Sequence, residues 1–87
     1  MASTMGFMVL IVYTKKGCWW CDDLLSFLRA KSIPFEEREV LSDPTYFKEM
    51  VELSGQTKAP TVLIDGKVYA DTDKEEIEPI LKTYTYK

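Results

Sequence analysis

Histidine is absent from this chain of 87 residues, and cysteine occurs only twice. Without histidine there is no histidine metal ligand, no histidine general base and no Ser–His or Cys–His nucleophile pair. The chain has fewer basic than acidic residues: its 11 Lys and Arg and 14 Asp and Glu give a net charge of −3. This balance gives no electrostatic basis for binding nucleic acid or an anionic membrane. No apolar run approaches the roughly 20 residues that a membrane-spanning helix needs, so we expect no membrane partner.

The N-terminal segment is apolar but lacks the basic residues that begin a secretory signal peptide. Met5 offers a second start, so residues 1–6 are expected to be a flexible segment and residues 7–87 a single domain. A hydrophobic content of 46% suffices for one modest core. Exported proteins of this size usually carry a cleavable leader and several disulfides, and we therefore expect a cytoplasmic location.

Hydrophobic periodicity predicts the element order β-α-β-α-β-β-α. The continuous apolar run 7–13 is typical of a buried central strand, and Thr14 to Gly17 is expected to be a polar turn. A helix then begins at Cys18 and closes at Lys31. Further strands are expected at 35–40, 60–64 and 67–69, the last two joined by a two-residue hairpin turn at 65–66.

Two more helices are predicted from their capping signals. Ser42 or Asp43 caps the second helix, which begins with Pro44 and ends at Gly55. Thr72 or Asp73 caps the last helix. The apolar residues expected to face the core are Phe47, Met50, Val51 and Leu53 in the second helix and Ile77, Ile80 and Leu81 in the last. Pro79 is expected to kink that last helix or to lie near a late start of it.

Cys18 and Cys21 are separated by two residues at the start of the first predicted helix. Unpaired backbone N–H groups and the helix dipole favour negative charge there, and Lys15 and Lys16 precede the first cysteine. A cysteine in such a setting has a pKa of roughly 3.5–7.5. Cys21 lies one turn further in and should be less exposed. We therefore predict Cys18 as the attacking nucleophile and Cys21 as the resolving thiol.

Other uses of the pair stay open from the residues alone. Asp22 and Asp23 follow directly and oppose a thiolate, so the lowering of the Cys18 pKa should be weaker. A structural disulfide here closes a loop of about four residues and adds little stability. A structural zinc site needs four ligands, which this chain supplies only as a dimer. Two inert core cysteines are the third alternative.

With these residues in place, the sequence resembles the glutaredoxin branch of the thioredoxin superfamily over roughly residues 7–83. The matching stretches are 12–18 with Cys21, 33–36, 54–56, 59–62 and 64–66. The resemblance implies a thioredoxin-like (glutaredoxin) fold, a four-stranded mixed sheet with three helices. It also implies a cis Ala59–Pro60 bond that faces the cysteines; without it, Pro60 would be expected merely to begin an edge strand.

The resemblance also implies a glutathione site. Lys15 would contact the glutathione carboxylate and Trp20 would flank the site. Ala59, before Pro60, would offer its backbone N–H and C=O to a substrate's disulfide segment. Thr72 and Asp73 would hold the γ-glutamyl end, with a plain helix cap as the simpler alternative.

Three features depart from the family pattern. Lys58-Ala59 replaces the usual Thr-Val before the proline. The usual Gly-Gly pair is missing from residues 70–74, where Asp71 adds negative charge. Trp19 replaces the proline after the first cysteine, and with Trp20 it forms either a surface cover or a platform for a protein partner. The electron donor is therefore left open between glutathione and a thioredoxin reductase, as in glutaredoxin-like proteins that supply ribonucleotide reductase.

The leading hypothesis is a monomeric thiol–disulfide oxidoreductase that reduces protein or glutathione mixed disulfides without a metal. One alternative is a carrier of a [2Fe–2S] cluster held by Cys18 and glutathione between two subunits, a property of family members without that proline. The other is a redox-inert thioredoxin-like binding module.

Overall fold

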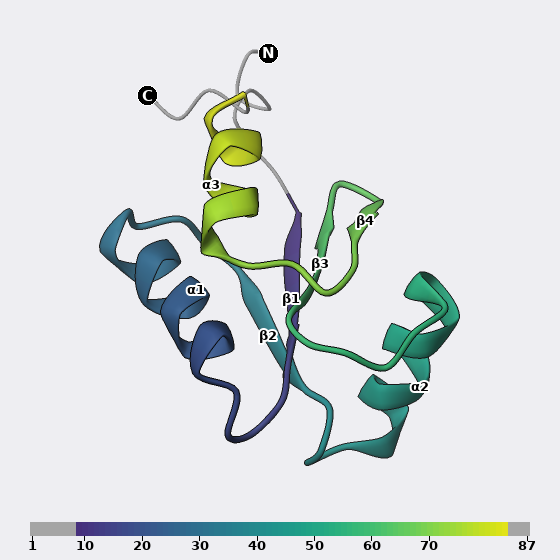
Figure 1. The fold of residues 1–87 in the computed structure, drawn as a ribbon. Helices are drawn as coiled ribbons and strands as arrows, with labels where there is room; N and C mark the ends of the chain where they lie inside the picture. The colour runs from purple at the N-terminus through teal and green to yellow at the C-terminus, as the bar shows by residue number, and fades with distance from the viewer. Residues whose placement is uncertain (1–8, 84–87) are drawn as a thin grey trace.

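The computed structural model describes residues 9–83, and Figure 1 shows their arrangement. The elements, which follow the predicted order, are β1 (Leu10–Thr14), α1 (Trp19–Ala30), β2 (Glu36–Glu39), α2 (Pro44–Ser54), β3 (Thr61–Ile64), β4 (Lys67–Tyr69) and α3 (Lys74–Lys82). The expected flexible segment 1–6, and residues 7 and 8 of the first expected strand, lie outside the described residues. In the described part, no helix is long and apolar enough to cross a membrane.

The four strands form one mixed sheet in the order β2-β1-β3-β4. β1 runs parallel to β2 and antiparallel to β3, and β3 runs antiparallel to β4. β1 is therefore an interior strand, as its apolar run predicts. β3 is interior as well, so the expectation that Pro60 merely begins an edge strand is wrong.

Two cores lie on opposite faces of the sheet, because successive side chains of a strand point to opposite sides. In β1, Leu10 and Val12 face the core shared with α1 and α3, whereas Tyr13 packs with Met50 of α2 on the other face. Figure 1 shows α1 and α3 on one side of the sheet and α2 on the other. The larger core contains Leu10, Val12, Leu24, Leu25, Leu28, Ile33, Val62, Ile64, Ile77 and Leu81.

Each helix begins at a side chain that accepts a backbone N–H. Cys18 caps α1, Asp43 caps α2 with Pro44 in the first turn, and Asp73 caps α3. Of the predicted alternatives, the structure therefore selects Asp43 over Ser42 and Asp73 over Thr72. Gly55 ends α2 with a left-handed φ of 71°, a conformation that glycine adopts without steric cost.

Three local expectations are corrected. Thr14 is the last residue of β1 rather than part of the turn, and its carbonyl accepts the N–H of Val40. Leu53 is 43% exposed, because the face of α2 that meets the sheet is narrow and Met50 is its one fully buried residue. α3 begins at Lys74 with Pro79 in its interior, so the late start expected as one alternative is wrong.

Strand register brings three distant segments to one end of the sheet. Tyr13 lies opposite Thr61, and Thr14 lies opposite Glu39. The loop after β1, which leads to Cys18, therefore meets the segment before β3, which contains Pro60. The end of β2 lies beside the same loop.

Candidate active site

Cys18 lies at the N-terminus of α1, where the chain leaves a turn at Gly17 with a φ of 84°. Its Sγ accepts the backbone N–H of Cys21 at 3.1 Å and is joined to Cys21 in a disulfide. Cys21 is 1% exposed, whereas Cys18 is only partly buried. Cys21 is therefore less exposed than Cys18, as its place one turn further into the helix predicted. After reduction, the N–H of Cys21 and the helix terminus both favour a thiolate on Cys18.

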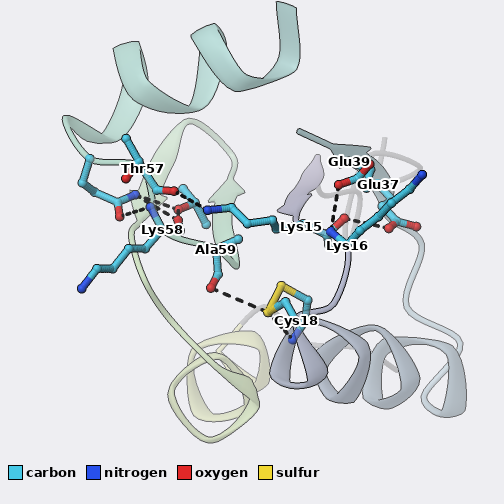
Figure 2. Close-up of a disulfide and its surroundings, with 12 residues drawn as sticks. Lys15, Lys16, Cys18, Glu37, Glu39, Thr57, Lys58 and Ala59 are labelled. Atoms are coloured by element: carbon cyan, nitrogen blue, oxygen red, sulfur yellow. Dashed lines mark hydrogen bonds between the residues drawn. A yellow bond between two sulfur atoms is a disulfide. The ribbon is translucent and has the colours of Figure 1, made fainter. Parts of the chain in front are cut away.

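The segment before β3 lies directly against this sulfur. The Ala59–Pro60 peptide bond is cis, as the resemblance implied, and the carbonyl oxygen of Ala59 lies 3.8 Å from Cys18 Sγ. Figure 2 shows this approach, with the carbonyl oxygen of Ala59 directed at the sulfur. Behind it, the carbonyl of Pro60 accepts the N–H of Thr72 at 2.9 Å. The start of α3 is thus attached to the same segment.

Gln56 holds the segment that contains Lys58 and Ala59 in place. Its side-chain carbonyl accepts the N–H of Lys58 at 2.7 Å, and its amide group donates to the carbonyl of Lys58 and to the hydroxyl of Thr61. The sequence reasoning assigned no role to Gln56. Its place directly after the helix-ending Gly55 was the available signal, since a side chain there can bond the loop that follows.

Glu39 is a second positioning residue that the sequence reasoning missed. Its carboxylate accepts the backbone N–H of Lys16 at 2.9 Å and those of the turn after β2, including Leu41 at 3.1 Å. The hydrogen bond from the hydroxyl of Ser42, followed by these backbone donors, lowers the pKa of Glu39. Figure 2 shows the carboxylate on the side of the loop away from Ala59. Glu39 therefore secures the loop that carries Cys18.

A groove of about 470 Å³ opens over the disulfide. Four predicted site residues line it together with Lys58 and Asp71: Lys15, Cys18, Trp20 and Ala59. The ammonium of Lys15 donates to the carbonyl of Thr57 at 3.1 Å, on the side of the loop opposite Glu39 (Figure 2). Lys16 is not among the residues that line the groove.

Thr72 and Asp73 line an adjacent groove of about 480 Å³, formed with Trp19, Trp20, Asp23, Asp71 and Glu75. Asp73 caps α3 by accepting the N–H of Glu76 at 2.9 Å, and the hydroxyl of Thr72 donates to the carboxylate of Glu76. The two grooves share Trp20 and Asp71 and are therefore adjacent. The predicted residues thus gather around one surface, with Pro60 buried behind it.

The two tryptophans are the most exposed large apolar side chains near the sulfur. Trp19 is 67% exposed and Trp20 is 44% exposed, and their rings meet edge to face with centroids 5.1 Å apart. Across residues 9–83, no group of three or more Cys, Asp or Glu is arranged to hold a metal ion. The groove therefore holds the partly exposed Cys18 beside the ring of Trp20 and the backbone of Ala59.

Known proteins that resemble this chain are glutaredoxins, glutaredoxin-like proteins and thioredoxin-like proteins. A glutaredoxin-like 8.6 kDa protein from the rubredoxin operon of Clostridium pasteurianum, described as uncharacterized, is 31% identical, covering 82% of this chain and 95% of that protein. Glutaredoxin 3 of Escherichia coli K12 is 28% identical, and the match covers 82% of this chain and 94% of that protein. The crystal structure of the thioredoxin-like protein BC3987 superposes with a TM-score of 0.75 at 28% identity, covering 82% of this chain and 97% of that one.

A glutaredoxin from Archaeoglobus fulgidus has the same fold, with a TM-score of 0.73 at 18% identity over 88% of this chain and 89% of that one. The glutaredoxin family model matches residues 10–69, which include both cysteines and the cis proline. The match ends before residues 70–74, where the family's glycines are missing. A thioredoxin-like fold with a close cysteine pair supports thiol–disulfide oxidoreductase chemistry in general. The chain belongs to the glutaredoxin family.

Proposed function

We propose that this protein reduces disulfides through the Cys18–Cys21 dithiol. The observation that carries the proposal is the position of the disulfide at the start of α1, with Cys21 buried and Cys18 open to a groove. A substrate can therefore reach one sulfur, while the other is held behind it. A reducing compartment such as the cytoplasm suits a disulfide that must be reopened in every cycle.

The reaction consists of two thiol–disulfide exchanges. Cys18 thiolate attacks one sulfur of the substrate disulfide, forming a mixed disulfide and releasing the first substrate thiolate. Cys21, after losing its proton, attacks Cys18 Sγ, which forms the intramolecular disulfide and releases the second thiolate. Two electrons pass to the substrate, and each released thiolate takes up a proton. The N–H of Cys21, which points at Cys18 Sγ, stabilises that sulfur as the attacking thiolate.

The segment before Pro60 suits an extended substrate. Ala59 has no backbone partner among the hydrogen bonds of the described residues, apart from the approach of its carbonyl to Cys18 Sγ. An extended peptide can pair with these free groups as an added strand. Such pairing would place a substrate cystine against Cys18, which is the geometry that the exchange requires.

For regeneration, we propose a thioredoxin reductase as the preferred electron donor, with glutathione as the weaker one. Lys15 and Lys58 offer positive charge to a glutathione carboxylate in the first groove. Asp71 lines both grooves and opposes the carboxylate of the γ-glutamyl end near Thr72 and Asp73. Binding of a protein reductase does not require a carboxylate at this position.

Turnover of a disulfide substrate, coupled either to thioredoxin reductase or to glutathione with its reductase, tests this proposal. We expect faster turnover with thioredoxin reductase. Cys18→Ser should abolish turnover with both donors. Cys21→Ser, the matched replacement, should still form a mixed disulfide with the substrate that mass spectrometry detects. An active Cys18→Ser protein would refute the assignment of the nucleophile, and a wild-type pair that no reductant opens would indicate a redox-inert binding module.

A further inference from the structure

The groove beside the reactive sulfur carries a marked excess of negative charge. Of the seven residues that line it, four have carboxylates and none is Lys or Arg: Trp19, Trp20, Asp23, Asp71, Thr72, Asp73 and Glu75. The carboxylates come from α1, from the segment after β4 and from the start of α3. The fold therefore gathers them from three separate elements onto one surface.

Two helix N-termini oppose this charge but do not cancel it. The starts of α1 and α3 border the groove, and each acts as roughly half a positive charge. Against about +1 from the two termini stand four carboxylates, so the sum is on the order of −3. An anionic ligand is repelled by this balance, and a cationic one is attracted.

The tryptophans form an independent feature of the same groove that favours a cation. Trp19 and Trp20 are 67% and 44% exposed, and indole is the aromatic group that attracts Lys and Arg side chains most strongly. Trp20 and Asp71 also line the groove over Cys18. A chain bound at Cys18 can therefore continue into the acidic groove without leaving the surface.

We propose that the acidic groove selects substrates by binding a basic segment of polypeptide next to the cystine to be reduced; this inference rests on the proposed function. Lys or Arg side chains of the substrate lie against the tryptophan rings and the carboxylates of Asp23 and Glu75. The occupant is a polypeptide because the two adjacent grooves, about 470 and 480 Å³, extend from Ala59 to Glu75. The exchange itself is unchanged: substrate cystine becomes two thiols as Cys18 and Cys21 become a disulfide.

Single-turnover reduction of synthetic peptides tests the groove without any electron donor. The prereduced protein is mixed with one of three cystine-linked peptide dimers, in which arginine, serine or glutamate flanks the cysteine. Each second-order rate constant is divided by that of dithiothreitol with the same peptide, because flanking charge alters the reactivity of the cystine. We expect the arginine peptide to exceed the glutamate peptide about tenfold in this ratio, a preference that weakens as salt is added.

A matched pair of double variants locates the preference. Asp23→Asn with Glu75→Gln removes two charges from the groove, and we expect the arginine preference to fall to about twofold or less. Asp22→Asn with Glu52→Gln makes the same change in net charge on two exposed residues that do not line the groove. This control should retain the wild-type preference.

The outcomes separate this inference from the proposed function. Equal normalised rates for the three peptides would overturn the groove's role while leaving the oxidoreductase assignment intact. If both double variants lost the arginine preference, the effect would come from net charge alone. That result would also overturn the groove's role and leave the oxidoreductase assignment intact. Failure of the reduced protein to open any of the peptides would instead contradict the proposed function.

Discussion

Asp71 occupies a backbone position that ordinarily favours glycine. Its φ is 51°, in the left-handed region that Asp tolerates better than most residues. Asp71 thus adopts a turn conformation without the glycine pair that the resemblance led us to expect in residues 70–74. What changes is the charge, since the Asp71 carboxylate lines both grooves.

Removing that carboxylate should improve the use of glutathione. For Asp71→Gly and Asp71→Asn we expect kcat/KM in the glutathione-coupled assay to rise about fivefold, because a like charge near 4 Å costs about 1 kcal/mol even in water. Both residues accept a positive φ, so the free energy of unfolding should change by no more than about 1 kcal/mol. Glu52→Gln, on an exposed residue that lines neither groove, is the control for net charge. An increase with Gly alone would indicate a backbone effect instead.

At this scale the close cysteine pair at a helix start could be predicted from the sequence, whereas the residues that position the surrounding loops were missed. The spacing of Cys18 and Cys21 at a helix start is a local pattern, and exposure follows from it. Gln56 bonds residues only two to five positions away, so its signal was local and was missed. Glu39 acts through a tertiary contact, because its carboxylate accepts the backbone N–H of Lys16, 23 residues away. No local pattern encodes such a pairing, because it depends on the register between β1 and β2.

The residues at the start of α3 both cap the helix and line the candidate site. Asp73 accepts the N–H of Glu76, and the N–H of the preceding Thr72 is bonded to the carbonyl of Pro60. The helix start and the segment before β3 are therefore secured at the same place. Loss of the cap should loosen the rim of the acidic groove as well as the helix.

Asp73→Ala should lower the free energy of unfolding by about 1 kcal/mol, the usual cost of losing an N-cap. Asp73→Asn keeps a side-chain oxygen for capping and should cost much less. Urea unfolding monitored by circular dichroism measures both. Equal losses in the two variants would assign the effect to charge at the helix terminus rather than to the hydrogen bond.

Element order and helix ends were predictable because their signals are local. Pro44 and Gly55 mark the two ends of α2 in the sequence, and the structure confirms both, with Asp43 rather than Ser42 as the cap. Leu53 was wrongly predicted to face the core. Helical spacing shows which side of α2 is apolar, but the width of the side that is buried depends on how closely α2 approaches the sheet. Pro79 left the start of α3 ambiguous in the sequence, because proline lacks the backbone N–H that a helix interior needs. In the structure the helix nevertheless begins at Lys74, since the packing of Ile77 and Leu81 in the core outweighs the loss of that hydrogen bond.

Across the whole molecule, the face of the sheet opposite the disulfide helix contains a buried phenol. Tyr13 is 1% exposed, and its hydroxyl donates to the carboxylate of Glu49 at 3.0 Å. Arg38 donates to both groups and links β2 to α2. Burial, and then the hydrogen bond to Glu49, raise the pKa of Tyr13 above its ordinary value of 10.0, and Arg38 offsets part of this rise.

This shift predicts a loss of stability at alkaline pH. Because the folded state holds the Tyr13 proton more tightly than the unfolded state does, its contribution is complete below pH 10.0 and disappears as pH rises through the folded pKa. Tyr13→Phe should be less stable than wild type at neutral pH, by about 1 kcal/mol for the lost hydrogen bond. This difference should shrink above pH 10.0, because the variant has no proton to lose at that position.

Urea midpoints measured from neutral to alkaline pH provide the test, since lysines that titrate in the same range are common to both proteins. Tyr46→Phe is the matched control for the loss of a phenol hydroxyl, because Tyr46 is only partly buried and packs against the same core. Tyrosinate absorbance should show one late-titrating group that Tyr13→Phe removes. If the difference in urea midpoint between wild type and Tyr13→Phe were the same at every pH, the raised pKa of Tyr13 would be contradicted. The hydroxyl would then contribute to stability without any dependence on pH.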